Sequence, residues 1–137
     1  YYNIGLKSFI NDTDEAFIKN NIVYFNKNYN IKRIRFTLDH ELGHILLKHE
    51  NLNHTIHTYN NIEEYQANIF ARCLLMPAIV LKELNCISPQ DISNICQVSL
   101  QAAEYRSKRM QKLLLRNKFN LSPLERQVYN NFKNFIS

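Results

Sequence analysis

Residues 36–47 constrain this chain more than any other stretch, because they place the pattern H-E-x-x-H inside an otherwise apolar run. An α-helix turns by about 100° per residue, so His40 and His44 lie one turn apart and both imidazoles can reach a single ion. Glu41 lies on the flank of that face, where a general base for metal-assisted hydrolysis stands without binding the metal itself. The pattern therefore predicts a helical site for a divalent metal.

Apolar residues on two faces of this predicted helix argue against a chance match on a solvated surface. One stripe consists of Ile34, Leu38, Leu42 and Ile45, and the other consists of Phe36, His40, His44 and Leu47. We expect the helix to run from about Ile31, with Asn30 as its N-cap, and both faces to be buried. Burying two histidines and a glutamate without partners is costly, and a divalent cation is a suitable partner.

A third protein ligand is needed, because a catalytic zinc site usually takes three and leaves a fourth position open. We expect Glu64, near the start of a second helix that begins at Asn61. Ala67 and Ala71 on the same helix are small enough to let the two helices approach closely. Two alternatives stay open, since Glu64 can instead complete a capping box with Asn61, and the neighbouring Glu63 can take the ligand position.

Asn68 follows Glu64 by one helical turn. From there its side chain can hydrogen-bond the nitrogen of a ligating histidine that points away from the metal, which fixes the orientation of the ring. The second helix is apolar nearly all round from Ala67 to Met76, which predicts a central, buried position.

His49 extends the motif to H-E-x-x-H-x-x-x-x-H and raises the question of a three-histidine site. A continued helix places His49 about 160° away from the face of the two motif histidines. The three-histidine variant also requires a glycine where Leu47 stands. We expect His49 to cap the helix end or to pack there. His54 and His57 are expected on a surface loop, from which either can enter a cleft as a transition-state stabiliser.

The segments on either side of the motif predict a small sheet and further helices. Residues 16–18 and 22–25 predict two strands joined by a turn at Asn20 and Asn21, because asparagine tolerates positive φ. Residues 12–15 have turn and helix-start chemistry, and residues 1–10 predict the end of a strand or a packing arm. A last helix at residues 122–136 begins with a capping box at Ser122 and Glu125.

Residues 88–116 resemble a helix-turn-helix, with Ser88 and Pro89 starting the first helix and Val98-Ser99 leading into the second. The second helix carries Arg106, Lys108, Arg109, Lys112 and Arg116 beside an apolar face of Leu100, Ala103, Met110, Leu113 and Leu114. DNA binding is not favoured, because the net charge is only +5 and the basic residues are not dense. We expect the apolar face to be buried and the charges to be solvated.

The composition is that of one small globular domain. Of 137 residues 45% are hydrophobic, and only 2 Gly and 3 Pro favour long helices. Three cysteines among apolar neighbours, Cys73, Cys86 and Cys96, are typical of reduced core thiols in the cytoplasm. No stretch has the pattern of a signal peptide or of a membrane span. The first residue is Tyr1 rather than Met, which fits a segment missing before it.

Taken together, these motifs resemble the ImmA/IrrE-type metallopeptidase family. The similarity covers Arg35-Phe36-Thr37, residues 40–44, Glu64-x-x-Ala67-Asn68-x-Phe70-Ala71, Leu74-Leu75-Met76-Pro77, Val98-Ser99 and residues 106–110, about two thirds of the chain. The segment before the motif helix is short for this family, so we expect an N-terminal portion of many relatives to be missing.

The resemblance implies a compact α+β fold that is mostly helical, with a small antiparallel sheet packed on the H-E-x-x-H helix. We place a zincin-like core at residues 1–80 and a C-terminal helical segment at residues 81–137, packed on the core as one domain. The resemblance also implies zinc ligands at His40, His44 and Glu64, and a general base at Glu41. Family members resemble cytoplasmic regulators that cleave or inactivate a helix-turn-helix repressor, often encoded beside them in mobile elements or stress-response loci.

We therefore expect a cytoplasmic, zinc-dependent endopeptidase that acts on a protein substrate, with no membrane partner. Imidazole and carboxylate ligands suit Zn²⁺ best, and Mn²⁺ or Fe²⁺ fit the same ligands less well. The alternative from another class is a DNA- or protein-binding regulator with a vestigial or structural metal site. A weaker alternative is a toxin-like hydrolase whose substrate is not a repressor.

Overall fold

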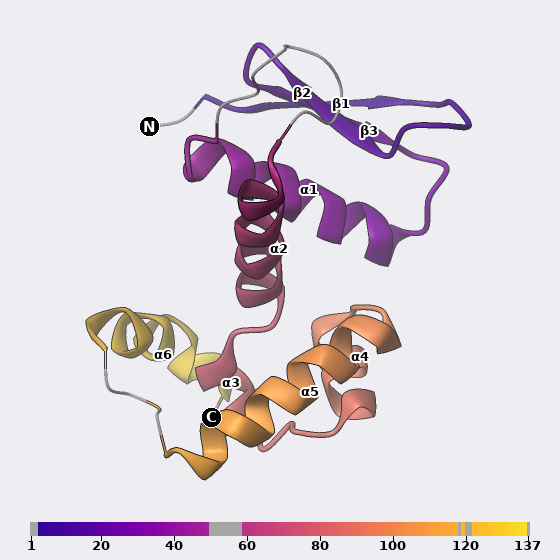
Figure 1. The fold of residues 1–137 in the computed structure, drawn as a ribbon. Helices are drawn as coiled ribbons and strands as arrows, with labels where there is room; N and C mark the ends of the chain where they lie inside the picture. The colour runs from indigo at the N-terminus through magenta and orange to yellow at the C-terminus, as the bar shows by residue number, and fades with distance from the viewer. Residues whose placement is uncertain (1–2, 50–58, 118, 120–121, 137) are drawn as a thin grey trace. The chain divides into compact units, whose positions relative to one another are not determined.

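Three short strands form a mixed sheet at the start of the chain in the computed structural model, which describes residues 3–49, 59–117, 119 and 122–136 (Figure 1). The strands are β1 (Gly5–Phe9), β2 (Ala16–Lys19) and β3 (Ile22–Asn26), in the order β1-β3-β2. β3 pairs antiparallel with β2 and parallel with β1. The expected all-antiparallel sheet was therefore wrong for β1. Residues 10–15 carry the chain across to the far edge of β3, so β1 and β3 run in the same direction.

The β2–β3 hairpin has the turn that the sequence predicted. Asn20 and Asn21 adopt φ values of 52° and 58°, as a tight hairpin turn requires. Of the turn and helix-start chemistry expected at residues 12–15, the turn is confirmed, because Oδ1 of Asn11 accepts the backbone N–H of Asp14 at 3.0 Å. The helix start was wrong. β2 follows this turn directly.

Asn26 ties this turn to the end of β3. Its side chain is only 1% exposed, and Nδ2 donates to the backbone oxygens of Asn11 and Asp14 at 2.8 Å and 2.9 Å. Oδ1 of Asn26 accepts the backbone N–H of Asn28 at 3.0 Å. A buried amide with its donors and acceptor satisfied fixes the loop that leads from the sheet towards the motif helix.

The motif helix α1 (Ile31–Leu46) begins as predicted, with Oδ1 of Asn30 accepting the backbone N–H of Arg33 at 3.0 Å. It packs against β2 and β3. The expectation of two buried faces holds only for His44, which is 1% exposed. The other residues of the two stripes are half-buried, apart from Leu47, which is 46% exposed where the helix stops. Glu41, which lies on neither stripe, is 7% exposed.

Helix α2 (Asn61–Leu75) has its N-cap one residue earlier than expected, at Asn60. Oδ1 of Asn60 accepts the backbone N–H groups of Ile62 and Glu63, each at 3.0 Å, and the backbone N–H of Asn60 donates to Oε2 of Glu63 at 3.1 Å. The capping box therefore joins Asn60 to Glu63 rather than Asn61 to Glu64. Glu63 serves the cap, which leaves Glu64 for another role.

Burial along α2 is one-sided. Ala67 and Ala71 are 0% exposed, whereas Ile69 and Leu74 are 40% and 49% exposed. The expectation of a helix buried all round was therefore wrong, because Ala67, Ala71 and the half-buried Phe70 lie on the packed side while Ile69 and Leu74 face outward. Cys73 is also exposed, so it is not the core thiol that was expected.

The chain forms two compact units, residues 1–71 and 72–137. Their boundary lies within α2, whereas the sequence placed a division after residue 80, and packing of both parts as one domain stays a prediction. The second unit contains α3 (Ala78–Glu83), α4 (Pro89–Cys96), α5 (Leu100–Leu115) and α6 (Pro123–Ile136). None of the described helices has the length and apolarity needed to cross a membrane.

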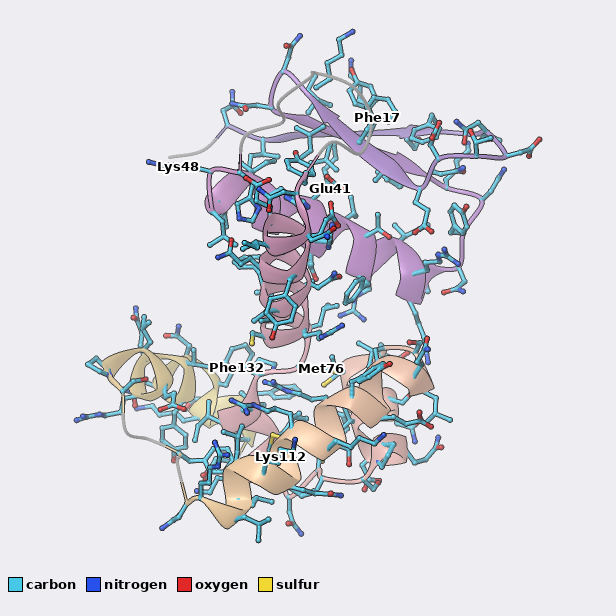
Figure 2. The ribbon with its side chains drawn as sticks, in the orientation of Figure 1. Phe17, Glu41, Lys48, Met76, Lys112 and Phe132 are labelled. Carbon is cyan, nitrogen blue, oxygen red and sulfur yellow. The ribbon has the colours of Figure 1, made fainter. Side chains whose placement is uncertain are left out.

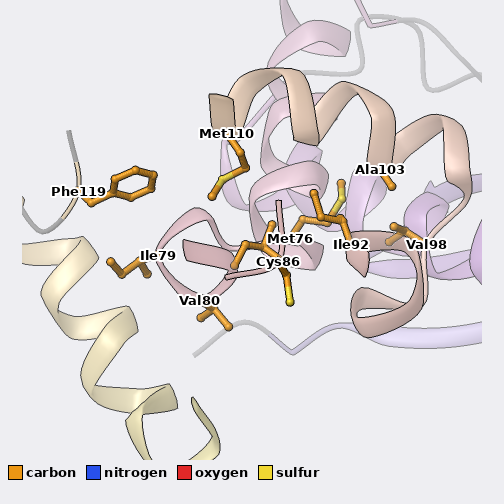
Figure 3. Close-up of a cluster of buried hydrophobic side chains, with 10 residues drawn as sticks. Met76, Ile79, Val80, Cys86, Ile92, Val98, Ala103, Met110 and Phe119 are labelled. Carbon is orange, nitrogen blue, oxygen red and sulfur yellow. The ribbon is translucent and has the colours of Figure 1, made fainter. Parts of the chain in front are cut away.

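The core of the second unit gathers side chains from α3, α4, α5 and the segments next to them (Figure 3). Its buried members are Met76, Ile79, Val80, Leu81, Cys86, Ile92, Val98, Ala103, Met110 and Phe119. Ser88 caps α4 as predicted, Ser99 caps α5, and Ser122 and Glu125 form the predicted capping box of α6. The fold is thus α+β and mostly helical, with α4 and α5 packed as a helix-turn-helix-like pair.

Arg106 departs from the solvated position expected for the basic residues of α5. It is only 9% exposed because it lies one turn from both Ala103 and Met110 on the buried face. Burial lowers the pKa of its guanidinium, against the opposing effect of Cys73, whose sulfur accepts a hydrogen bond from it. Leu100 is 48% exposed, so the expected apolar face was wrong at that position.

Candidate metal centre

Three side chains from two helices of the first unit converge on one point. Nε2 of His40 and Nε2 of His44 lie 3.0 Å apart. Oε2 of Glu64 lies 3.2 Å from Nε2 of His40, and Oε1 of Glu64 lies 3.5 Å from Nε2 of His44. Zinc–nitrogen bonds of 2.0–2.1 Å in a tetrahedron place neighbouring ligand atoms about 3.3 Å apart. The spacing of these donor atoms fits a bound metal ion.

Small residues bring the two helices close enough for this convergence. Gly43 on α1 is buried against α2, and a Cβ added there would lie 3.2 Å from Cα of Ala67 and 3.1 Å from Cδ1 of Phe70. The expected contribution of Ala67 holds, and Gly43 makes an equal contribution from the other helix. The contact sets how far Glu64 stands from the two histidines.

Asn68 lies where the sequence placed it relative to His40. Oδ1 of Asn68 is 3.2 Å from Nδ1 of His40. Because an amide oxygen only accepts, Nδ1 of His40 carries the hydrogen and Nε2 keeps its lone pair. The lone pair therefore faces His44 and Glu64, as a metal ligand requires.

His44 is held on two further sides. Nδ1 of His44 lies 2.9 Å from Nδ1 of His49, and the ring of Tyr59 stacks on the His44 ring with centroids 3.6 Å apart and planes 14° apart. His49 packs at the end of α1, as expected, but the extrapolated helix that placed its ring away from His44 was wrong. α1 ends at Leu46, and Lys48 at a φ of 56° turns the chain back towards His44.

Tyr59 was not singled out from the sequence. Its position in the sequence could have indicated its role. Tyr59 directly precedes the N-cap of α2, so it lies at the same end of that helix as Glu64. Burial, together with the charges of Glu41 and Glu64, raises the pKa of Tyr59 to about 12. The phenol therefore keeps its proton, and with it a hydrogen-bond donor, across physiological pH.

The two histidine rings of this site are uncharged near neutral pH. Burial, with contributions from the charges of His40 and His49, lowers the pKa of His44 to about 3. Burial also lowers the pKa of His40, against the opposing charge of Glu64. Both rings are thus neutral near pH 7, so two lone pairs and a carboxylate face one another. This donor set is satisfied by a divalent cation.

Glu41, on the same helix as the two histidines, is 7% exposed (Figure 2 labels it). Burial, followed by the negative charge of Glu64, raises the pKa of Glu41 to about 7. Such a carboxyl exchanges its proton near neutral pH, as a general acid or base does. His54 and His57, the other candidates from the sequence, lie outside the described residues.

The family model of the IrrE N-terminal-like domain, Peptidase_M78, matches residues 3–108. The chain belongs to this family of metallopeptidases. The match includes the sheet, α1 to α4 and the first part of α5, and it agrees with the resemblance drawn from the motifs. Membership gives the chain a metallopeptidase-type role and a protein substrate, and the His40, His44 and Glu64 cluster is compatible with the metal of such an enzyme. A search of curated proteins found no match.

Proposed function

We propose that this IrrE-family chain is a cytoplasmic, zinc-dependent endopeptidase that hydrolyses a peptide bond in a helix-turn-helix transcriptional repressor. The observation that carries the proposal is the convergence of His40, His44 and Glu64 beside the buried Glu41. Two neutral imidazoles and one carboxylate are a ligand set of catalytic zinc sites that leave a position open.

In this proposal His40 and His44 bind zinc through Nε2 and Glu64 binds it through its carboxylate. When bound, zinc supplies Lewis acidity, which polarises a carbonyl and makes water a better nucleophile near neutral pH. The hydrogen bond from His40 to Asn68 holds the His40 ring in the ligating tautomer. Mn²⁺ and Fe²⁺ are accepted by the same ligands and are the secondary choices.

Glu41 is the proposed general base. Its carboxylate takes a proton from the attacking water and later delivers it to the leaving amine nitrogen, so one group serves both steps. The pKa of Glu41, raised to about 7 by burial, suits this exchange, and a cation nearby favours the ionised form that accepts the proton.

Support for a repressor substrate comes from the resemblance to ImmA/IrrE-type peptidases and from family membership. Support for the cytoplasm comes from Cys73, Cys86 and Cys96, which are free thiols in the structure. In this account the enzyme removes a repressor from its operator by cleaving it, in a mobile element or a stress response.

The test compares newly formed protein N-termini in cells that express the wild type or Glu41→Gln. Removing the base lowers hydrolysis while the metal ligands stay in place. We expect new N-termini in the wild type only, within a helix-turn-helix protein. New N-termini in another kind of protein would support peptidase activity but contradict the repressor as its substrate. That result would favour the toxin-like hydrolase.

The same experiment separates the alternative regulator from the peptidase. A DNA- or protein-binding regulator with a vestigial or structural metal site changes gene expression equally as wild type and as Glu41→Gln. Equal transcript changes without any new N-terminus would therefore contradict hydrolysis as the function.

A further inference from the structure

The nitrogen of His44 that does not face His40 begins a hydrogen-bonded chain of three side chains. Nδ1 of His44 lies 2.9 Å from Nδ1 of His49, and Nε2 of His49 lies 2.9 Å from Oε1 of Gln66. The chain therefore starts on α1, passes through the turn that follows α1, and ends on α2.

One arrangement of hydrogens satisfies both hydrogen bonds with neutral rings. Oε1 of Gln66 is an amide oxygen and only accepts, so Nε2 of His49 carries the hydrogen. Nδ1 of His49 then has the lone pair, and Nδ1 of His44 donates to it. Nε2 of His44 is left with a lone pair, directed at the position shared with Nε2 of His40 and Oε1 of Glu64.

We infer that Gln66, acting through His49, sets the tautomer and the ring orientation of His44 for metal binding. The inference deepens the proposed function and rests on it, because it concerns the same metal site. Histidine ligands bind metals more tightly when the other ring nitrogen donates to a fixed acceptor. His49 and Gln66 are positioning residues in this account, since both act on the metal through His44.

The backbone places His49 for this task. Lys48 has a φ of 56°, and the backbone N–H groups of Lys48 and His49 donate to the carbonyls of Ile45 and His44 at 3.2 Å and 3.0 Å. These bonds are those of a helix end that closes through a left-handed residue. The ring of His49 is thereby returned to the side of His44.

Helix α2 contributes both amides that orient the two histidine rings. Asn68 accepts from His40 directly, and Gln66 accepts from His49, which in turn accepts from His44. Glu64, the proposed third ligand, precedes both on the same helix. A single helix thus supplies a ligand and the two acceptors that select the ligating tautomers on α1.

The experiment measures the affinity for Zn²⁺ by competition with a chelating dye, and the visible spectrum with Co²⁺, on the full chain. We expect His49→Leu to weaken zinc binding by about 10- to 100-fold, and Gln66→Met to weaken it by about 10-fold. His49→Asn, which offers an amide oxygen near the position of Nδ1, restores most of the lost affinity. Gln101→Met changes an exposed glutamine of α5 and is the matched control.

The double variant tests the order of the chain. Because Gln66 acts through His49, Gln66→Met has no further effect once His49→Leu is present. The Co²⁺ spectrum of His49→Leu changes shape as the ligand geometry relaxes, an effect that a loss of stability alone does not produce. Gln66 is exposed, so Gln66→Met tests the idea even if His49→Leu fails to fold.

Three results would overturn the inference. Wild-type affinity in His49→Leu or in Gln66→Met would remove the positioning effect. An equal loss from Gln66→Met with and without His49 would show that Gln66 acts by another route. A wild type that binds neither Zn²⁺ nor Co²⁺ would instead reject the metal site, and with it the proposed function.

Discussion

The Nε2 atoms of His40 and His44 face each other at 3.0 Å, with the carboxylate of Glu64 within 3.5 Å of each. Their other ring nitrogens are engaged by Asn68 and His49, so both facing nitrogens carry lone pairs. Two lone pairs and a negative charge repel one another unless a cation stands among them. The metal-free site is therefore a source of instability that a bound metal removes.

Zinc is accordingly expected to stabilise the protein against heat. At a free concentration of 100 times Kd, a ligand that binds only the folded state adds about 2.7 kcal/mol of stability. The melting temperature is measured by calorimetry in chelator and in zinc buffer, and we expect it to rise in zinc. The His44→Ala variant serves as the control and shows no such rise. A wild-type melting temperature that zinc leaves unchanged would contradict this account.

Gly43→Ala is predicted to weaken metal binding through the contact between the helices. In an exposed helix, alanine is more favourable than glycine by about 0.5–1 kcal/mol. Here the new Cβ would meet Cα of Ala67 at 3.2 Å, and overpacking of this kind costs about 1–3 kcal/mol. The backbone of α2 has to move, and Glu64 moves with it.

The measurement for Gly43→Ala is zinc affinity together with the free energy of unfolding in chelator. We expect both to fall. Gly5→Ala is the control, since its Cβ would meet only the flexible side chain of Ile22 at 3.3 Å, outside the metal site. Unchanged zinc affinity in Gly43→Ala would show that the contact does not set the position of Glu64.

The pH dependence of stability without metal follows from Glu41. Burial raises its pKa from 4.5 to about 7, so the folded state holds this proton more tightly than the unfolded state does. Stability from this group is full below pH 4.5 and is lost as the pH rises through 7. Glu41→Gln cannot ionise, so it is expected to gain about 2 kcal/mol relative to the wild type between pH 5 and pH 8.

The free energy of unfolding is measured by urea denaturation in chelator at pH 5 and at pH 8. Glu104→Gln is the matched control, because Glu104 is exposed on α5 and the difference from the wild type should stay constant with pH. A gain that is equal for both variants, or absent for Glu41→Gln, would contradict the buried position of Glu41.

Asn26→Ala is predicted to destabilise the sheet unit. The substitution leaves the half-buried backbone oxygens of Asn11 and Asp14 without this donor. A buried polar group left without a partner costs about 1–3 kcal/mol, so a loss of about this size is expected in the free energy of unfolding. Asn131→Ala, at an exposed position of α6, should change it by less than about 0.5 kcal/mol. Equal values for the two variants would refute the role of the buried amide.

The sequence predicted those features that depend on local chemistry. Asn30 indicated the start of α1, and Asn20 and Asn21 indicated the hairpin turn. Helical spacing predicted that Glu64 and Asn68 lie on one face of α2, near the motif histidines. Each of these follows from a side chain and its near neighbours along the chain.

Features that depend on distant partners or on closely matched alternatives were not predictable. The pairing of β1 with β3 depends on a partner strand that residues 1–10 do not specify. Asn60 and Asn61 are equally good caps, and only the folded chain selects Asn60 and Glu63. Left-handed residues at helix ends are usually glycine or asparagine, so the positive φ of Lys48 could not be predicted from the sequence. The position of His49 beside His44 depends on it and was therefore not predictable either.

The central claim is tested most directly by the zinc content of the purified protein. It is measured by elemental analysis, with purification nickel excluded, on the wild type, His44→Ala, Glu64→Ala and Glu63→Ala. Near-stoichiometric zinc in the wild type and in Glu63→Ala, with loss in His44→Ala and Glu64→Ala, is the predicted result, because Glu63 caps α2 while Glu64 faces the histidines. A folded wild type that cannot be loaded with zinc, or Glu64→Ala with full zinc, would contradict the account.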